Sequence, residues 1–135
     1  MTCDELNAFF PSAQVICLDR TYGCPKAEWV TGKLVPYFKR RLLVARIFGW
    51  KTSFDCNRYA NAFKLAGDVL HANSPADDFE SLAIGVYCFI KLDGERHAIN
   101  VIVTKTGPFF IEPQTCQKVI LTTAEKQSAW LVLFV

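Results

Sequence analysis

Three side chains of this 135-residue sequence have types and spacing that could do chemistry together. Cys56 stands in KTSFDCNRYANAFK, His97 in RHAINVIVT and Glu112 in FFIEP. A thiol becomes a nucleophile when a histidine takes its proton, and a carboxylate can orient that histidine and stabilise its charged form. Cys56, His97 and Glu112 are therefore candidates for a catalytic triad in which the sulfur attacks a carbonyl carbon.

Cys56 stands at the predicted start of a helix. Apolar residues recur at intervals of three and four after it, which indicates an amphipathic helix. Thr52, Ser53 and Asp55 all favour the N-cap position, and TSFD has the form of a capping box. Cys56 then lies in the first turn, where unpaired N–H groups and the helix dipole stabilise an anion such as a thiolate.

The positions of His97 and Glu112 follow from a predicted antiparallel hairpin. LAIGVYCFIKL and RHAINVIVT are predicted strands joined by the turn DGE, and FFIEP is the next strand. The period of two separates His97 from Asn100, which points to the other face of the sheet. If the loop between RHAINVIVT and FFIEP has an even number of residues, Glu112 lies on the same face of the sheet as His97. A loop centred on Thr104 and Lys105 places the two side chains directly opposite, whereas a turn at Thr106 and Gly107 moves them apart.

These elements predict one α+β domain over 1–135, with a helical or irregular part at 1–49 and a core at 50–135. The helix that carries Cys56 is expected to pack on an antiparallel sheet of about five strands, built from Leu82 onward. Four residues of this helix test that packing. Phe63 and Leu70 are expected to be buried, and Lys64 and Asp68 are expected to be exposed.

Composition limits the possible partners and the redox state. Lysine and arginine number 15 against 13 acidic residues, so net charge predicts neither a nucleic-acid nor a membrane partner. The sequence shows no signal peptide and no long apolar run, which suggests a cytoplasmic location. We therefore expect all six cysteines to be reduced and Cys56 to be free, with no zinc site.

The order FDCNRYANAFK, GERHAINVIVT and FFIEPQT resembles the papain-like cysteine peptidases, over about residues 50 to 123. The closer resemblance is to their compact branch, which includes the protease domain of a mushroom agglutinin and small bacterial and phage relatives. This resemblance implies a papain-like fold and a triad of Cys56, His97 and Glu112. The residues that would support the triad or its oxyanion are Asp55, Trp50, Lys51, Asn100 and Gln114.

Two functions follow as hypotheses. The first is a thiol hydrolase, either a cysteine peptidase or an amidohydrolase, acting on a peptide or protein. The alternative is a non-catalytic module of the same fold, such as a phage-encoded inhibitor, that uses the basic residues Lys39, Arg40, Arg41 and Arg46. No cofactor is expected from the residues. The resemblance alone raises calcium, for which ADDFE supplies Asp77, Asp78 and Glu80 as oxygen ligands.

Overall fold

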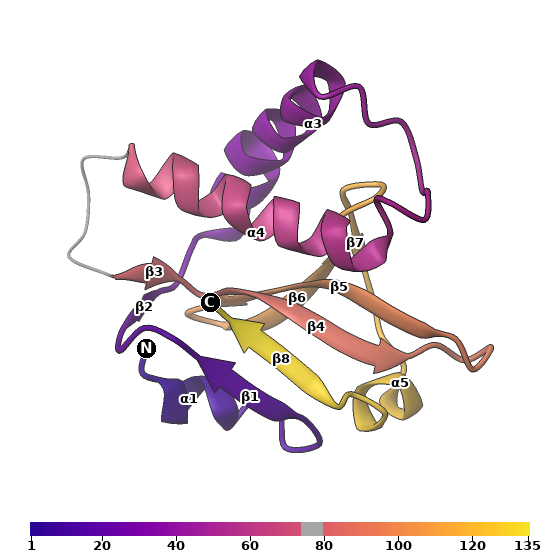
Figure 1. The fold of residues 1–135 in the computed structure, drawn as a ribbon. Coiled ribbons are helices and arrows are strands. Elements are labelled where there is room, and N and C mark those ends of the chain that lie inside the picture. Colours follow the sequence, from indigo (N-terminus) through magenta and orange to yellow (C-terminus); the bar gives the residue numbers. More distant parts are fainter. Residues whose placement is uncertain (74–79) are drawn as a thin grey trace.

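The computed structural model describes residues 1–73 and 80–135 (Figure 1). Over these residues the chain forms a large sheet of six strands, in the order β1-β8-β4-β5-β6-β7, and a small sheet of β2 and β3. The strands are β1 Gln14–Cys17, β2 Tyr22–Gly23, β3 Ser81–Leu82, β4 Ile84–Ile90, β5 Arg96–Thr104, β6 Gly107–Glu112, β7 Gln117–Val119 and β8 Leu131–Phe134.

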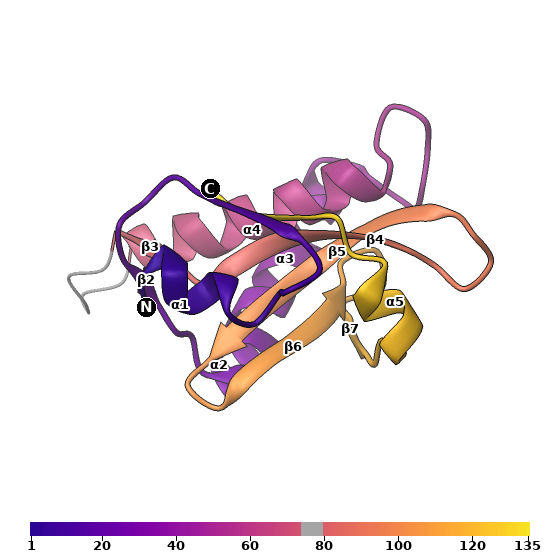
Figure 2. The same ribbon diagram turned by 90° about the horizontal axis from the view of Figure 1, so that it is seen from below.

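Helices cover both faces of the large sheet. They are α1 Cys3–Asn7, α2 Ala27–Trp29, the π-helical segment η1 Val30–Leu34, α3 Val35–Val44, α4 Cys56–Ala72 and α5 Thr123–Gln127. Figures 1 and 2 show α3 and α4 on one face and α1 and α5 on the other. α1 is capped by Thr2 through a capping box with Glu5, and α2 begins after Lys26.

The centre of the sheet follows the sequence pattern closely. β4 and β5 pair antiparallel across the turn at Asp93 and Gly94, so the predicted hairpin is confirmed. Alternate residues of β5 contribute to different cores. Ile99 and Val101 join the core on the α1 side, while Ala98 and Ile102 face the side covered by α4.

The expected papain-like α+β layout, with an antiparallel sheet of about five strands, is wrong. The sheet is mixed because β1 adds to its edge parallel to β8, with Gln14 opposite Leu131. β1 comes from the part of the chain predicted to be helical or irregular. Its four residues lack a clear apolar alternation, and its partner lies 117 residues later, so no local pattern indicates the pairing.

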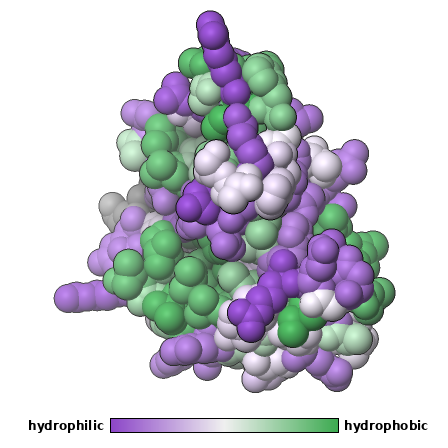
Figure 3. Space-filling view, turned by 45° about the vertical axis from the view of Figure 1, so that its right-hand side comes forward, coloured by the Kyte–Doolittle hydropathy of each residue, from purple (hydrophilic) through white to green (hydrophobic). Residues whose placement is uncertain are grey.

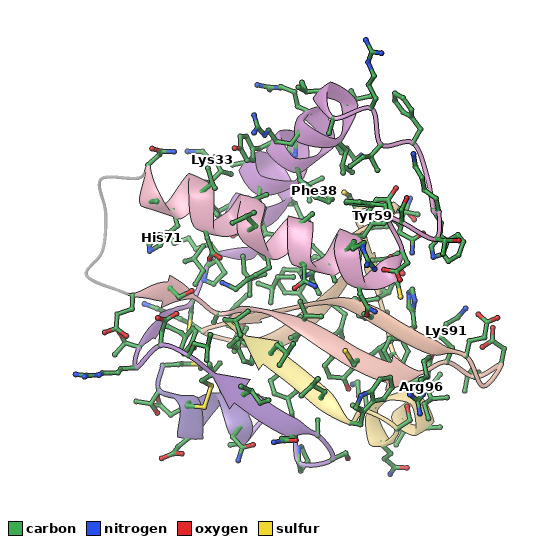
Figure 4. The ribbon with its side chains drawn as sticks, viewed as in Figure 1. Lys33, Phe38, Tyr59, His71, Lys91 and Arg96 are labelled. Carbon is green, nitrogen blue, oxygen red and sulfur yellow. A yellow bond between two sulfur atoms is a disulfide. The ribbon has the colours of Figure 1, made fainter. Side chains whose placement is uncertain are left out.

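Helix α4 is buried more deeply than its sequence pattern predicts. Phe63 is fully buried, as expected, and its ring packs edge-on at a centroid distance of 5.1 Å against Phe38 of α3, which is labelled in Figure 4. Leu70 is only half-buried. The prediction for Lys64 is wrong. Its ammonium is buried between the Asp68 carboxylate, at 2.7 Å, and the Ser81 hydroxyl, at 3.1 Å.

Asn100 fixes α4 to the sheet. Its Nδ2 donates to the carbonyl of Ala60 in α4 at 2.9 Å and to the carbonyl of Gly85 in β4 at 3.2 Å. The side chain is fully buried, and its Oδ1 has no hydrogen-bond partner within the described part of the chain. Because one amide joins three elements, the first turns of α4 are held at a defined place over β4 and β5.

The prediction that all six cysteines are reduced is wrong. Cys3 and Cys17 form a disulfide, whereas Cys24, Cys56, Cys88 and Cys116 are free. The bond forms because α1 packs beside β1, which brings the two Cα atoms to 5.9 Å. A covalent loop of this length stabilises the fold by about 3 kcal/mol, largely by restricting the unfolded chain.

Candidate functional site

Cys56 is the first residue of α4, as predicted. Asp55 is the N-cap, and its carboxylate accepts from the Arg58 N–H at 3.3 Å and from the Arg58 guanidinium at 3.2 Å. Desolvation acts to raise the pKa of Asp55, but these hydrogen bonds and the charge of Arg58 outweigh it and lower the pKa. The half-buried thiol packs beside Cys88 and Ala98, on the face of the sheet that α4 covers.

His97 and Glu112 are in direct contact. The His97 Nε2 and the Glu112 Oε2 lie 2.6 Å apart, and the two side chains are 16% and 19% exposed. The loop between β5 and β6 consists of Lys105 and Thr106, which sets Glu112 opposite Ile99. This register falls between the two considered from the sequence. The carboxylate therefore reaches the imidazole diagonally across the strand pair.

Cys56 is not joined to this pair. No hydrogen bond connects its sulfur to His97 within the residues that the structure describes. Cys56 packs beside Ala98, the direct neighbour of His97 in β5. Burial raises the pKa of the Cys88 thiol, and the neighbouring Cys56 adds to this increase.

The other residues named from the sequence have different roles. Trp50 and Lys51 lie exposed in the loop before α4. Asn100 binds backbone carbonyls and does not contact His97. Gln114 does reach the pair, since its backbone N–H donates to Glu112 Oε1 at 3.2 Å.

The calcium expectation has little structural support. Asp77 and Asp78 lie outside the described residues, and Glu80 accepts a hydrogen bond from the backbone N–H of Arg20 at 2.6 Å. Over 1–73 and 80–135, no cluster of three or more histidine, cysteine or acidic side chains could hold a metal ion.

A second pair of functional groups at this end of the sheet was missed from the sequence. The Arg96 guanidinium lies over the Trp130 ring, 5.6 Å from its centroid, and Trp130 is 41% exposed. β5 begins at Arg96 and β6 ends at Glu112, so antiparallel pairing brings these residues to the same end. Figure 4 shows Arg96 below the first turns of α4, where Tyr59 is labelled. The available signal was the tryptophan directly before β8.

A hollow at the opposite end of α4 was also missed. It has a volume of about 940 Å³, which is within the usual range for small-molecule sites. Its polar and aromatic lining includes Cys24, Lys26, Trp29, His71 and Lys105. Residues from the turn before α2, from the last turn of α4 and from the β5–β6 loop form it together, so no single stretch of sequence indicates it.

Among the described helices, none is both long enough and apolar enough to cross a membrane.

Comparisons with known proteins give a fold relationship. No protein-family model and no curated protein matches the sequence. A solved complex of PSL1a with E64 matches with a TM-score of 0.76 and 21% identity, covering 99% of this chain and 51% of that one. The Polyporus squamosus lectin bound to the human-type influenza-binding epitope Neu5Aca2-6Galb1-4GlcNAc matches with a TM-score of 0.73 and 21% identity, covering 99% and 49%. The chain thus spans about half the length of each.

These matches correct the functional reading of the sequence. The expected papain-like cysteine peptidase, and with it the thiol hydrolase or papain-like inhibitor, is wrong, because the structures that share this fold are those of PSL1a and a lectin. The triad of Cys56, His97 and Glu112 stays a prediction, of which the structure contains the contact between His97 and Glu112. Neither match supports the expected peptide or protein target.

Proposed function

We propose that this chain is a carbohydrate-binding module and that it holds an acidic glycan at the end of the sheet where α4 begins. The site consists of the His97–Glu112 pair and the Arg96–Trp130 pair, and Cys56 lies beside Ala98 of the same strand. The observation that carries the proposal is that a hydrogen-bonded acid and imidazole, and a guanidinium held over an exposed indole, occur at the same end of one sheet.

The His97–Glu112 pair suits the hydroxyl groups of a sugar. Glu112 uses one oxygen for His97 and the other for the N–H of Gln114, which fixes the carboxylate. A carboxylate accepts about four hydrogen bonds, so it can still accept from a sugar hydroxyl. Because Nε2 of His97 faces the carboxylate, Nδ1 is the ring atom left for a ligand. Charge-assisted hydrogen bonds of this kind are stronger than neutral ones.

The Arg96–Trp130 pair suits an acidic sugar. The half-exposed indole offers an apolar surface against which the C–H face of a pyranose can pack, and its N–H remains a donor. Arg96 supplies a forked donor that matches a carboxylate such as that of Neu5Ac. The lectin match supports this ligand class, since that lectin was solved with a Neu5Ac epitope.

Calorimetric titration of the whole chain tests the proposal with two glycans. Neu5Aca2-6Galb1-4GlcNAc is expected to bind, and Galb1-4GlcNAc without Neu5Ac is expected to bind more weakly. Trp130→Ala and Arg96→Ala should each reduce the affinity at least about tenfold, which corresponds to ~1.4 kcal/mol. Glu112→Gln should reduce binding of both glycans, because it removes the negative charge of the carboxylate that accepts hydrogen bonds from the sugar hydroxyl groups.

Two variants in the hollow serve as matched controls. Trp29→Ala removes an indole and Lys26→Ala removes a cation without touching the proposed site. If they reduce glycan affinity while the Trp130 and Arg96 variants do not, the site proposal is wrong although the ligand class stands. If neither glycan binds the folded wild-type chain, the functional proposal is wrong.

We infer a second ligand, E64, from the complex solved for PSL1a. The free thiol of Cys56 in the first turn of α4 is the candidate contact. Incubation with E64 is expected to slow the alkylation of Cys56 by iodoacetamide and to leave that of Cys24 unchanged. Equal protection of both thiols, or of neither, would contradict a site at Cys56.

A further inference from the structure

One segment of the chain concentrates positive charge. Between Glu28 and Asp55 the sequence contains no acidic residue, but it contains six basic ones. These are Lys33, Lys39, Arg40, Arg41, Arg46 and Lys51. The segment therefore carries a formal charge of +6, while the whole chain carries +2, so that the remainder is at −4. The nearly balanced total conceals a strongly basic region.

The same segment exposes large apolar side chains. Leu43 and Val44 at the end of α3 are 62% and 73% exposed, and Phe48 and Trp50 in the next loop are 71% and 60% exposed. We call residues 43–50 the α3 tip. Figure 1 shows this end of α3 and the loop after it at the outer edge, away from the sheet. In Figure 3, which brings that side forward, apolar and hydrophilic surfaces alternate over the upper part of the molecule.

The exposed side chains are held outward by the residues between them. Ile47 packs into the core between α3 and α4, and its N–H donates to the Leu42 carbonyl at 2.9 Å. The Tyr59 hydroxyl of α4 donates to the Gly49 carbonyl at 2.8 Å. Gly49 has a φ of +90°, a conformation that favours glycine. Phe48 and Trp50 thus flank an anchored residue and cannot fold back into the core without breaking that hydrogen bond.

We propose that the α3 tip docks on an anionic lipid surface. The charge attracts acidic headgroups, and the lysine and arginine stems can extend to them. The apolar side chains enter the interfacial layer, where tryptophan and phenylalanine are favoured. Nucleic acid would use the charge but leave the aliphatic residues Leu43 and Val44 in water. This proposal replaces the expectation of no membrane partner, which rested on the total charge, and it does not depend on the proposed glycan site.

Vesicle sedimentation of the full chain tests the docking. The chain is expected to sediment with phosphatidylcholine vesicles that contain about 30% phosphatidylserine, and not with phosphatidylcholine alone. About 0.5 M salt should reduce binding, because it screens the headgroup charge. Trp50 should report insertion through a blue-shifted fluorescence that is missing in Trp50→Phe.

Paired variants separate the two contributions. Two double variants should each weaken vesicle binding at least about tenfold. One combines Phe48→Ser with Trp50→Ser, and the other combines Arg40→Glu with Arg41→Glu. The matched controls are Ile120→Ser, at a residue that is 97% exposed elsewhere, and Lys126→Glu; both should bind like the wild type. All altered residues are exposed, so circular dichroism should show unchanged folding for each variant.

Four outcomes would overturn the proposal. They are equal sedimentation with neutral vesicles, no sedimentation at all, equal effects of the control variants, and preferential binding to duplex DNA over anionic vesicles. A concentration-dependent dimer that is lost in the Phe48 and Trp50 double variant, without vesicle binding, would also overturn it. That result would assign the α3 tip to a contact between copies of the chain.

Discussion

Helices α4 and α3 are neighbours on the same face of the sheet, but they use their charged residues in opposite ways. α4 buries Lys64 and pairs it with Asp68 and Ser81, and its carbonyl at Ala60 is bound by Asn100. α3 buries only Phe38 among its residues and leaves its basic side chains in water. The comparison teaches that α4 belongs to the core of the domain, whereas the outer end of α3 is free to contact something else.

The two helices are expected to differ most in how much their apolar residues contribute to the free energy of unfolding. Phe63→Ala should lower the free energy of unfolding by about 3–5 kcal/mol, because it opens a cavity against Phe38. Leu43→Ala at the α3 tip should change it by less than about 0.5 kcal/mol. Urea denaturation measures both. A similar loss in the two variants would mean that the α3 tip contributes to the core.

The buried lysine of α4 should give the next largest effect. Asp68→Ala leaves the Lys64 ammonium buried without its carboxylate and should cost about 2 kcal/mol, less than a fully buried pair because Asp68 is 34% exposed. Lys64→Met removes the charge and keeps the length of the side chain, so it should cost less. Lys39→Met on α3 is the control and should be nearly neutral. If Asp68→Ala is neutral too, Lys64 is not held by this contact.

The start of α4 depends on a single cap. Asp55→Ala should destabilise the fold by about 1 kcal/mol, since it leaves the Arg58 N–H without its acceptor. Asp55→Asn keeps an acceptor and should recover most of that loss. Thermal unfolding of the two variants gives the comparison. Equal losses would show that the charge, and not the hydrogen bond, stabilises this turn.

For the thiols we expect the smallest effect on stability but a clear difference in how fast they are alkylated. At about pH 7.5, iodoacetamide should modify Cys56 before Cys88 and Cys116, because a thiolate is the reactive form of cysteine. Burial raises the pKa of both slower thiols. A raised pKa means less thiolate at a given pH, so their labelling should increase as the pH rises. Peptide mapping that finds Cys88 labelled first would contradict this order.

Local patterns predicted the elements around the candidate site well. The polar residues before Cys56 indicated the start of α4, which the structure confirms, with Asp55 as the cap. The DGE turn predicted the β4–β5 hairpin, and the period of two predicted which β5 residues share a face. These features depend on neighbours in the sequence, so the residues themselves contain the information.

Features that depend on distant residues could not be predicted. Lys64 looks like a solvent-facing residue until Asp68 and Ser81 are placed beside it. The Cys3–Cys17 bond requires α1 and β1 to pack together, and the Arg96–Trp130 pair requires β8 to lie next to β4. The resemblance to papain-like peptidases rested on three short stretches around Cys56, His97 and Glu112. Such stretches do not determine which distant strands complete the sheet.

The parallel pairing of β1 with β8 has a consequence for synthesis on the ribosome. β8 lies between β1 and β4, so neither β1 nor the free edge of β4 has its partner until the chain has been translated past Phe134. At usual translation speeds, the 117 residues that separate Gln14 from Leu131 require roughly 6–23 s. The edge of β4, which bears Val86, Tyr87 and Cys88, is open to strands of other nascent chains for the shorter time between the synthesis of Ile90 and that of Leu131, roughly 2–8 s. Expression yield should therefore depend on how quickly a chaperone covers this edge.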